Sequence, residues 1–326
     1  MKRVVYSEFG HPADVVSVLD VTRGPLDPGQ VRIDVMRSPI NPSDLLQIAG
    51  QYGVKPPLPA TPGNEGIGRI VDMAEDVQGL KIDQIVMIPA GIGVWQQQID
   101  APALGLIPLP EADLDQLSMI TINPPTAYLL LDDFVDLQAG DWIIQSAANS
   151  AVGGYVVQLA KERGIRTINI VRREDAIAPL QQLGADVVVL DGPNMEADIR
   201  AAVGDGKIRL GIDAVSGALF ARMADLLSNG GTMVSYGALS GEAAQVSPQA
   251  TIFRDIQVRG FWLARWFGVA DQARKIDVFS NLITRIATGA ITAPVEAVYG
   301  LDDIHTAMEH AAKPNRSGKI LIAPNG

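Results

Sequence analysis

The chain has 326 residues, with 26 basic and 37 acidic side chains, a formal net charge of −11 and no cysteine. The excess of negative charge argues against nucleic acid and anionic membrane surfaces as partners, because both repel such a surface. Without cysteine there can be no disulfide, no thiolate zinc site and no cysteine nucleophile. The length exceeds that of a usual single core, and 47% hydrophobic residues are enough to support two domains.

The N-terminal residues and the apolar stretches give an expectation for location. Met1-Lys2-Arg3 is followed by Val-Val-Tyr and then by Ser-Glu, and no later run approaches the length of a membrane span. We therefore expect a soluble, cytoplasmic protein with no membrane partner.

Residues 1–115 are rich in proline, glycine and short stretches in which apolar and polar residues alternate. Val31–Val35, Gly68–Asp72 and Gln84–Ile88 are three such stretches, and Asp27-Pro28-Gly29 is a typical turn sequence. This pattern predicts a β-rich domain in the form of a partly open barrel.

Residues 142–173 are typical of a strand, a tight turn, a helix and a second strand. Trp142–Gln145 is apolar, and the helix that follows, from Ala151 to Gly164, has apolar residues at helical spacing. Thr167–Val171 is the second strand. A helix N-terminus in this position attracts a pyrophosphate, because its N–H groups are unpaired and its dipole is positive there. The unit therefore predicts a dinucleotide site.

The glycine fingerprint of this unit is incomplete. Ala148 and Ser150 occupy the first two positions of Gly-x-Gly-x-x-Gly, and only Gly153 remains, so a crossover without a ligand stays an alternative. Arg172 and Arg173 stand where an NAD site usually has an acidic residue, roughly 20 residues beyond the turn. Two arginines there favour a 2′-phosphate and hence NADPH.

Helices and strands continue to alternate after this unit. The predicted helices are Ala176–Leu183, Met195–Val203 and Ala218–Leu227, and the further predicted strands are Val187–Leu190, Leu210–Ala214, Thr232–Tyr236 and Gln257–Leu263. Six strands joined by crossovers predict an α/β fold with a Rossmann-type, doubly wound parallel sheet.

A long helix, Asp271–Gly289, and a closing strand, Lys319–Ala323, return to the first domain. We therefore expect residues 1–116 and 267–326 to form the β-rich catalytic domain and residues 117–266 to form the dinucleotide-binding domain. The active site is expected in the cleft between them. The apolar edge near Gln257–Leu263 predicts a homodimer, because a bare edge strand invites pairing.

Five segments occur in one order along the chain: Ile40–Asp44, Gly50–Gly53, Pro62–Gly66, Ile122–Tyr128 and Gly260–Leu263. Together they resemble the medium-chain dehydrogenase/reductase superfamily, and within it the zinc-independent, mitochondrial-type trans-2-enoyl thioester (enoyl-CoA/ACP) reductases. This resemblance implies that the β-rich domain is GroES-like. Asn-Pro-Ser-Asp and the tyrosine near residue 52 are also similar to zinc-free quinone oxidoreductases.

The resemblance implies roles for particular residues. Tyr52 would hydrogen-bond to the thioester carbonyl and help to deliver a proton, although a tyrosine among glycines is also a common loop anchor. The family reads Arg-Asp-Arg where this chain reads Arg-Arg-Glu, so Glu174 leaves the strictness of NADPH selectivity open. Cofactor contacts are implied for Asn123, Asn149, Ser150, Ala151, Val152, Arg172, Arg173, Tyr236, Gly237, Ala238, Leu239, Phe261, Trp262, Leu263, Ala264 and Lys319. The aromatic residues among them could instead belong to the sheet or to a subunit interface.

No metal site is predicted. Zinc-binding members of the superfamily have a cysteine near Pro42 and a histidine at Asn64, and this chain has neither ligand. His305 and His310 are five residues apart, too far round a helix to act together, and all three histidines are interpreted as solvated or locally hydrogen-bonded. The acidic residues Asp132, Asp133 and Asp136 are interpreted as a solvated helix end.

Three hypotheses for function follow. The first is an NADPH-dependent reductase of the C=C bond of trans-2-enoyl thioesters, linked to CoA or to an acyl-carrier protein, in fatty acid metabolism. The second is an NADPH:quinone or small-enone reductase. The third is an NADPH-binding protein without turnover.

Overall fold

A computed structural model describes all 326 residues, which form two compact units. Unit 1 comprises residues 1–122 and 280–326, and unit 2 comprises residues 123–279. The domain boundaries expected from the sequence, at 116/117 and 266/267, stay a prediction. None of the helices combines the length and the apolar composition that crossing a membrane requires.

Unit 2 is built on a six-stranded sheet with the order β10-β9-β8-β11-β12-β13. The strands are β8 (Trp142–Gln145), β9 (Arg166–Val171), β10 (Val187–Leu190), β11 (Ile208–Asp213), β12 (Thr232–Ser235) and β13 (Gln257–Gly260). Every neighbouring pair is parallel. The expected doubly wound sheet is therefore confirmed, and its order reverses between β8 and β11, where such sheets bind ligands.

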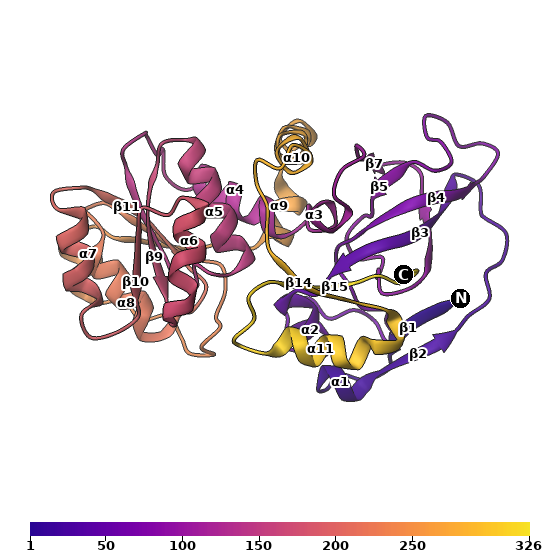
Figure 1. The fold of residues 1–326 in the computed structure, drawn as a ribbon, viewed down its shortest axis with the longest axis horizontal. Coiled ribbons are helices and arrows are strands. Elements are labelled where there is room, and N and C mark those ends of the chain that lie inside the picture. The colour runs from indigo at the N-terminus through magenta and orange to yellow at the C-terminus, as the bar shows by residue number, and fades with distance from the viewer. The chain divides into compact units, whose positions relative to one another are not determined.

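Helices cover both faces of this sheet (Figure 1), with α5 and α6 on one side and α7 and α8 on the other. The helices are α4 (Asn123–Asp132), α5 (Ala151–Glu162), α6 (Ile177–Leu183), α7 (Met195–Val203), α8 (Gly217–Leu226), α9 (Leu263–Val269) and α10 (Gln272–Ala287), the last of which crosses the second unit boundary. Buried residues from strands and helices, such as Ile144, Ile168 and Phe220, share one core.

The last predicted strand of unit 2 is shorter than expected. The sequence predicts Gln257–Leu263, but β13 ends at Gly260 and Leu263 begins α9. The ladder stops there because Gly260 pairs with Ser235, the last residue of β12, and a strand without a neighbour gains no further ladder bonds.

Unit 1 is β-rich, as expected. Its larger sheet has the order β14-β15-β3-β4-β5-β7, and β6 also pairs with β3. The strands are β1 (Lys2–Tyr6), β2 (Val16–Asp20), β3 (Gln30–Pro39), β4 (Ile67–Met73), β5 (Ile85–Met87), β6 (Gln98–Pro102), β7 (Ile107–Pro108), β14 (Val295–Tyr299) and β15 (Lys319–Ile322). The helices are α1 (Pro12–Val15), α2 (Pro42–Ile48), α3 (Leu114–Ser118) and α11 (Ile304–Ala312). In β3, Val31, Ile33 and Val35 alternate into the core, which is the period that the sequence shows.

Candidate active site

Most of the predicted cofactor residues follow strands of the parallel sheet in unit 2. The turn after β8 contains Asn149 and Ser150, Arg172 follows β9, Tyr236 follows β12 and Phe261 follows β13. Parallel strands end at the same edge of a sheet, so these segments share its carboxyl edge. The structure thus brings together, within one unit, residues that are more than 100 positions apart in the chain.

The turn between β8 and α5 has the features of an anion-binding helix start. Ser150 is the N-cap of α5, and its Oγ accepts a hydrogen bond of 3.1 Å from Gly153 N. A Cβ at Gly153 would lie 2.4 Å from Ala148 O, so only glycine allows the helix to approach the turn this closely. Ala147 has φ +47°, a left-handed conformation that is rare for alanine. This turn and the start of α5, here called the glycine cradle, fit a pyrophosphate. Gly153 leaves the backbone N–H groups uncovered by a side chain, and the dipole of α5 favours negative charge.

The two arginines after β9 differ in their surroundings. Arg172 is exposed and makes no ion pair, whereas Arg173 Nε lies 3.2 Å from Asp175 Oδ1. Glu174 begins the short 3₁₀ turn that follows and is also exposed. Arg172 is therefore the side chain with its charge available for a phosphate.

The segments after β12 and β13 combine buried and exposed residues. The Tyr236 hydroxyl hydrogen-bonds to the Ser150 side chain, and burial raises the pKa of this phenol above its usual value. Leu239 is 63% exposed and Trp262 is 40% exposed, whereas the Phe261 ring packs edge-on against Phe134. Leu239 and Trp262 therefore expose side-chain surface that a ligand can contact. The remaining predicted residues of these segments are Gly237, Ala238, Leu263 and Ala264.

Three predicted residues lie outside these strand ends. Asn123 is the buried first residue of α4, in unit 2. Tyr52 is half-buried, four residues after α2 in unit 1. Lys319, at the start of β15, is 6% exposed, and its Nζ donates to Asn41 Oδ1 at 2.6 Å and to Ile40 O at 3.1 Å. The assignment of all three to the reaction stays a prediction, and Lys319 already has two acceptors in its own unit.

A buried carboxylate at the carboxyl edge of the parallel sheet was missed by the sequence analysis. Asp213 is fully buried at the end of β11 and accepts hydrogen bonds from Ser146 Oγ at 2.7 Å, Val215 N at 3.1 Å and Ser216 N at 2.8 Å. These bonds join the carboxyl ends of β8 and β11, where the strand order reverses. The signal in the sequence is a polar residue that directly ends or follows an apolar strand, Ser146 after β8 and Asp213 at the end of β11.

A second buried polar cluster, in unit 1, was also missed. Asn41, Asp44, Glu65 and Lys319 are each at most 6% exposed. The sequence signals are an aspartate three residues after Asn41, which predicts a capping box, and a lysine at the start of an apolar strand.

The site does not fit zinc. Asn64, at the position of the usual histidine, donates from its backbone N and its Nδ2 to Asp44 Oδ1, at 3.0 and 2.7 Å. No group of three His, Cys, Asp or Glu residues in the structure could hold a metal ion. His310 lies between Tyr299 and Glu296, and His305 Nδ1 contacts Ala13 O, so both rings are locally hydrogen-bonded as expected.

Two of the three acidic residues at or after the end of α4, Asp132 and Asp133, are ion-paired rather than merely solvated. Arg274 donates to Asp132 and, at 3.0 Å, to Asp133. Asp132 and Asp133 thus share an arginine that lies 142 positions along the chain from Asp132.

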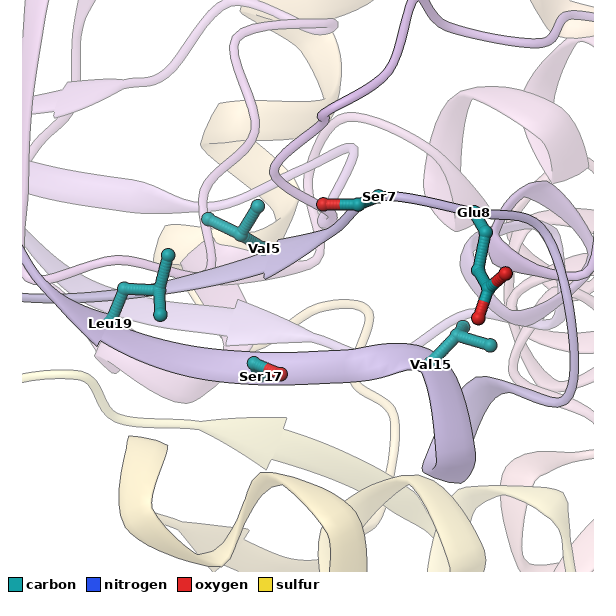
Figure 2. Close-up of a pocket in the computed structure, with 6 residues that line it drawn as sticks. All are labelled: Val5, Ser7, Glu8, Val15, Ser17 and Leu19. Atoms are coloured by element: carbon teal, nitrogen blue, oxygen red, sulfur yellow. The ribbon is translucent and has the colours of Figure 1, made fainter.

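A surface hollow of about 300 Å³ lies on β1 and β2 (Figure 2). Its lining residues are Val5, Ser7, Glu8, Val15, Ser17 and Leu19. None of the candidate site residues lines it.

Two family models match the chain. Residues 151–281 match "Zinc-binding dehydrogenase" and residues 27–111 match "Alcohol dehydrogenase GroES-like domain". The human mitochondrial enoyl-[acyl-carrier-protein] reductase is 34% identical over 329 residues, covering 99% of this chain and 88% of that protein. The expected GroES-like domain and the resemblance to the superfamily are thereby confirmed.

Solved structures agree with this assignment. Etr1p of Candida tropicalis, in a complex with NADP and crotonyl-CoA, has a TM-score of 0.90 at 25% identity and covers 99% of both chains. A candidate NADPH:quinone reductase from Bacillus thuringiensis has a TM-score of 0.89 at 26% identity, covering 99% of this chain and 98% of the other.

The cytoplasmic location expected from the sequence is contradicted by these relatives. The human, rat and nematode proteins are all named as mitochondrial. The expectation was wrong because it took the N-terminal residues and the absence of long apolar runs as evidence for a compartment, and these features do not distinguish the cytoplasm from a mitochondrion.

The relatives match from one end of the chain to the other, and the fold, the glycine cradle and the unpaired Arg172 are consistent with them. The chain belongs to the family of the mitochondrial enoyl-[acyl-carrier-protein] reductases, within the medium-chain dehydrogenase/reductase superfamily.

Proposed function

We propose that this protein uses NADPH to reduce the C=C bond of trans-2-enoyl thioesters carried by CoA or by an acyl-carrier protein, as an enzyme of fatty acid metabolism. The observation that carries the proposal is the similarity over 99% of the chain to enoyl-[acyl-carrier-protein] reductases, together with a structural neighbour whose complex contains NADP and crotonyl-CoA. The cradle at Gly153 and the available charge of Arg172 support the same cofactor.

The side chains have separate tasks in this reaction. Bound NADPH would supply the hydride for the β-carbon of the substrate. The N-terminus of α5 holds the pyrophosphate and Arg172 pairs with the 2′-phosphate. The Tyr52 phenol donates a hydrogen bond to the thioester oxygen, where negative charge develops, and helps to deliver a proton to the α-carbon.

A substrate panel tests the proposal. NADPH consumption is followed with crotonyl-CoA, longer enoyl-CoAs, an enoyl-acyl-carrier protein and quinones. Turnover of enoyl thioesters well above that of quinones is the expected result. The similarity to a candidate quinone reductase keeps an NADPH:quinone or small-enone reductase as the second function, and preferential quinone turnover would establish it. Binding of NADPH without turnover of any substrate would leave the third hypothesis, a non-catalytic protein.

The cofactor preference is expected to depend on Arg172. Titration of the apo protein should give tighter binding of NADPH than of NADH, and Arg172→Ala should reduce that preference roughly tenfold, because one charge-assisted bond to the phosphate is lost. Arg173→Ala is the matched control and should have a smaller effect, since Arg173 is already paired with Asp175. Equal affinities in the wild type would mean that Glu174 cancels the attraction.

Turnover is expected to need no metal. The chain contains no cysteine, and Asn64, at the position of the usual zinc-binding histidine, donates a hydrogen bond to Asp44. Assay after exhaustive chelation, with elemental analysis of the purified protein, checks this. Stoichiometric zinc whose removal abolishes turnover would contradict it.

A homodimer is expected to form through β13. This strand lies at one end of its sheet, all four of its residues are exposed, and Ile252 and Phe253 beside it are 70% and 79% exposed. A second copy can pair with such an edge by two-fold symmetry and cover both side chains. Light scattering should give twice the 34.7 kDa of the chain, and Phe253→Glu with Val258→Lys should give the monomer. A wild-type monomer at micromolar concentration would refute this assembly.

A further inference from the structure

We infer that Glu65 is a positioning residue, which acts through the Asn41 amide and helix α2 to fix the segment that carries Tyr52. This inference rests on the proposed function. It concerns the buried cluster of unit 1, in which Lys319, Asn41 and Glu65 form a chain of hydrogen bonds.

The chain of hydrogen bonds has one direction. Lys319 Nζ donates to Asn41 Oδ1 at 2.6 Å, and Asn41 Nδ2 donates to Glu65 Oε1 at 2.6 Å. An ammonium can only donate and a carboxylate can only accept, so the Asn41 amide between them fits in a single orientation. No direct ion pair joins Lys319 and Glu65, so the amide is what connects the two charges.

The second carboxylate oxygen of Glu65 accepts hydrogen bonds from two backbone N–H groups. Glu65 Oε2 accepts from Thr121 N at 3.1 Å and from Ile122 N at 2.9 Å. All three groups around this carboxyl are donors, which fits its ionised form. Burial raises the pKa of Glu65 and lowers that of Lys319, and the charge of each side chain opposes the shift of the other.

The cluster fixes the N-terminus of α2. Asp44 Oδ2 accepts from Asn41 N at 2.7 Å, and Asn41 in turn accepts from the helix, which makes a capping box with Pro42 at the first helical position. Asp44 also holds Asn64 through its other oxygen. The N-cap residue of α2 is therefore the same residue that connects Lys319 to Glu65.

The C-terminus of α2 leads to Tyr52 through a hydrogen-bonded turn. Gly50 N donates to Gln47 O and Gln51 N donates to Leu46 O, at 3.1 and 2.8 Å, with Gly50 at φ +70°. These are the two bonds of a Schellman motif, which determines the path of the chain as it leaves a helix. Tyr52 is the next residue, so a displacement of the seven-residue helix at Asn41 is transmitted to it.

The substitution Glu65→Gln makes two hydrogen-bond donors face each other in this series of hydrogen bonds. To keep accepting from Thr121 N and Ile122 N, the new side-chain amide must turn its NH₂ group toward Asn41 Nδ2, which is also a donor. If the Asn41 amide rotates instead, its own NH₂ group faces the Lys319 ammonium. A second substitution, Lys319→Gln, removes this conflict between donors, because an amide at each end allows Asn41 to rotate. The rotated amide then loses the hydrogen bond that Asn41 accepts from the start of α2.

The first test compares Glu65→Gln, Lys319→Gln and the double variant. Glu65→Gln should lower kcat with crotonyl-CoA about 10- to 100-fold, as expected for a slight misplacement of a reacting group, with the dissociation constant of NADPH within about twofold of the wild type. The double variant should recover part of the thermal stability and part of kcat. Full kcat in folded Glu65→Gln, or a double variant that is less stable than either single variant or does not fold, would overturn the inference.

The second test asks whether Glu65 acts through Tyr52. In a Tyr52→Phe background, Glu65→Gln should lower kcat less than threefold further, because effects of residues that act as one unit are not additive. A full multiplicative loss would contradict this. Weaker NADPH binding by Lys319→Gln would show that this lysine serves the cofactor instead. If the wild type does not reduce crotonyl-CoA, the proposed function fails, while the stability cycle still reports on the hydrogen-bond chain.

Discussion

Replacing Tyr52 by phenylalanine is expected to lower kcat with crotonyl-CoA on the order of a hundredfold, while the affinity for NADPH stays within about twofold. The phenol acts on charge that develops only as the hydride arrives, so its loss should appear in kcat and in kcat/KM together. The ring is retained, and packing of the half-buried side chain is nearly unchanged. Steady-state kinetics and a fluorescence titration of NADPH measure both quantities.

Tyr299→Phe is the matched control for this substitution. It also removes one phenolic hydroxyl from unit 1, one that hydrogen-bonds to His310 Nδ1 at 2.9 Å, and Tyr299 has no part in the proposed site. Its kcat should stay within about twofold of the wild type. If Tyr52→Phe is folded, binds NADPH and turns over like this control, then Tyr52 is a loop anchor and the quinone-reductase function gains support.

Gly153→Ala is expected to weaken NADPH binding at least tenfold and to lower the free energy of unfolding by about 1–3 kcal/mol. A Cβ there would lie 2.4 Å from Ala148 O and 2.7 Å from Ala148 Cα, both backbone atoms of the turn that holds the pyrophosphate. The turn must therefore move, and the N-terminus of α5 moves with it. Cofactor titration and chemical denaturation measure the two effects.

The neighbouring glycine provides the control. A Cβ at Gly154 would meet only Leu183 Cδ1, at 3.6 Å, which is an ordinary contact. Gly154→Ala in the same helix should be neutral or stabilising by about 0.5–1 kcal/mol, because alanine loses less conformational freedom on folding. Equal losses in both variants would mean that α5 tolerates no side chain on this turn and that close approach at Gly153 is not the cause.

Local patterns in the sequence predicted the parallel sheet well. Trp142–Gln145, Val187–Leu190 and Met195–Val203 have in the structure the same bounds as in the prediction. Each is a short apolar or periodic run with clear turn residues beside it, so the information that determines it lies within the run. The end of β13 could not be predicted in this way, because it depends on where β12 stops.

The buried carboxylates show the limit of such predictions. Glu65 lies in a loop, one residue before Gly66, and nothing near it in the sequence indicates a partner. Its partners are 24, 56 and 57 positions away, and only the folded chain brings them together. Asp213 and Ser146 are likewise 67 positions apart. The resemblance placed Lys319 near the cofactor, and the contacts of that lysine with Asn41 and Ile40 became visible only in the structure.

The discontinuity of unit 1 has a consequence for the order of folding during synthesis. Residues 123–279 are continuous, so unit 2 has all of its strands as soon as they have left the ribosome. Unit 1 must wait for its last segment, because β15 is the strand that lies between β3 and β14. Lys319 begins β15, so Glu65 and Asp44 have no ammonium beside them until residue 319 has been synthesised. A chain that stalls before residue 319 therefore contains two carboxylates that cannot be buried at low cost, which leaves the incomplete unit open to chaperones and proteases.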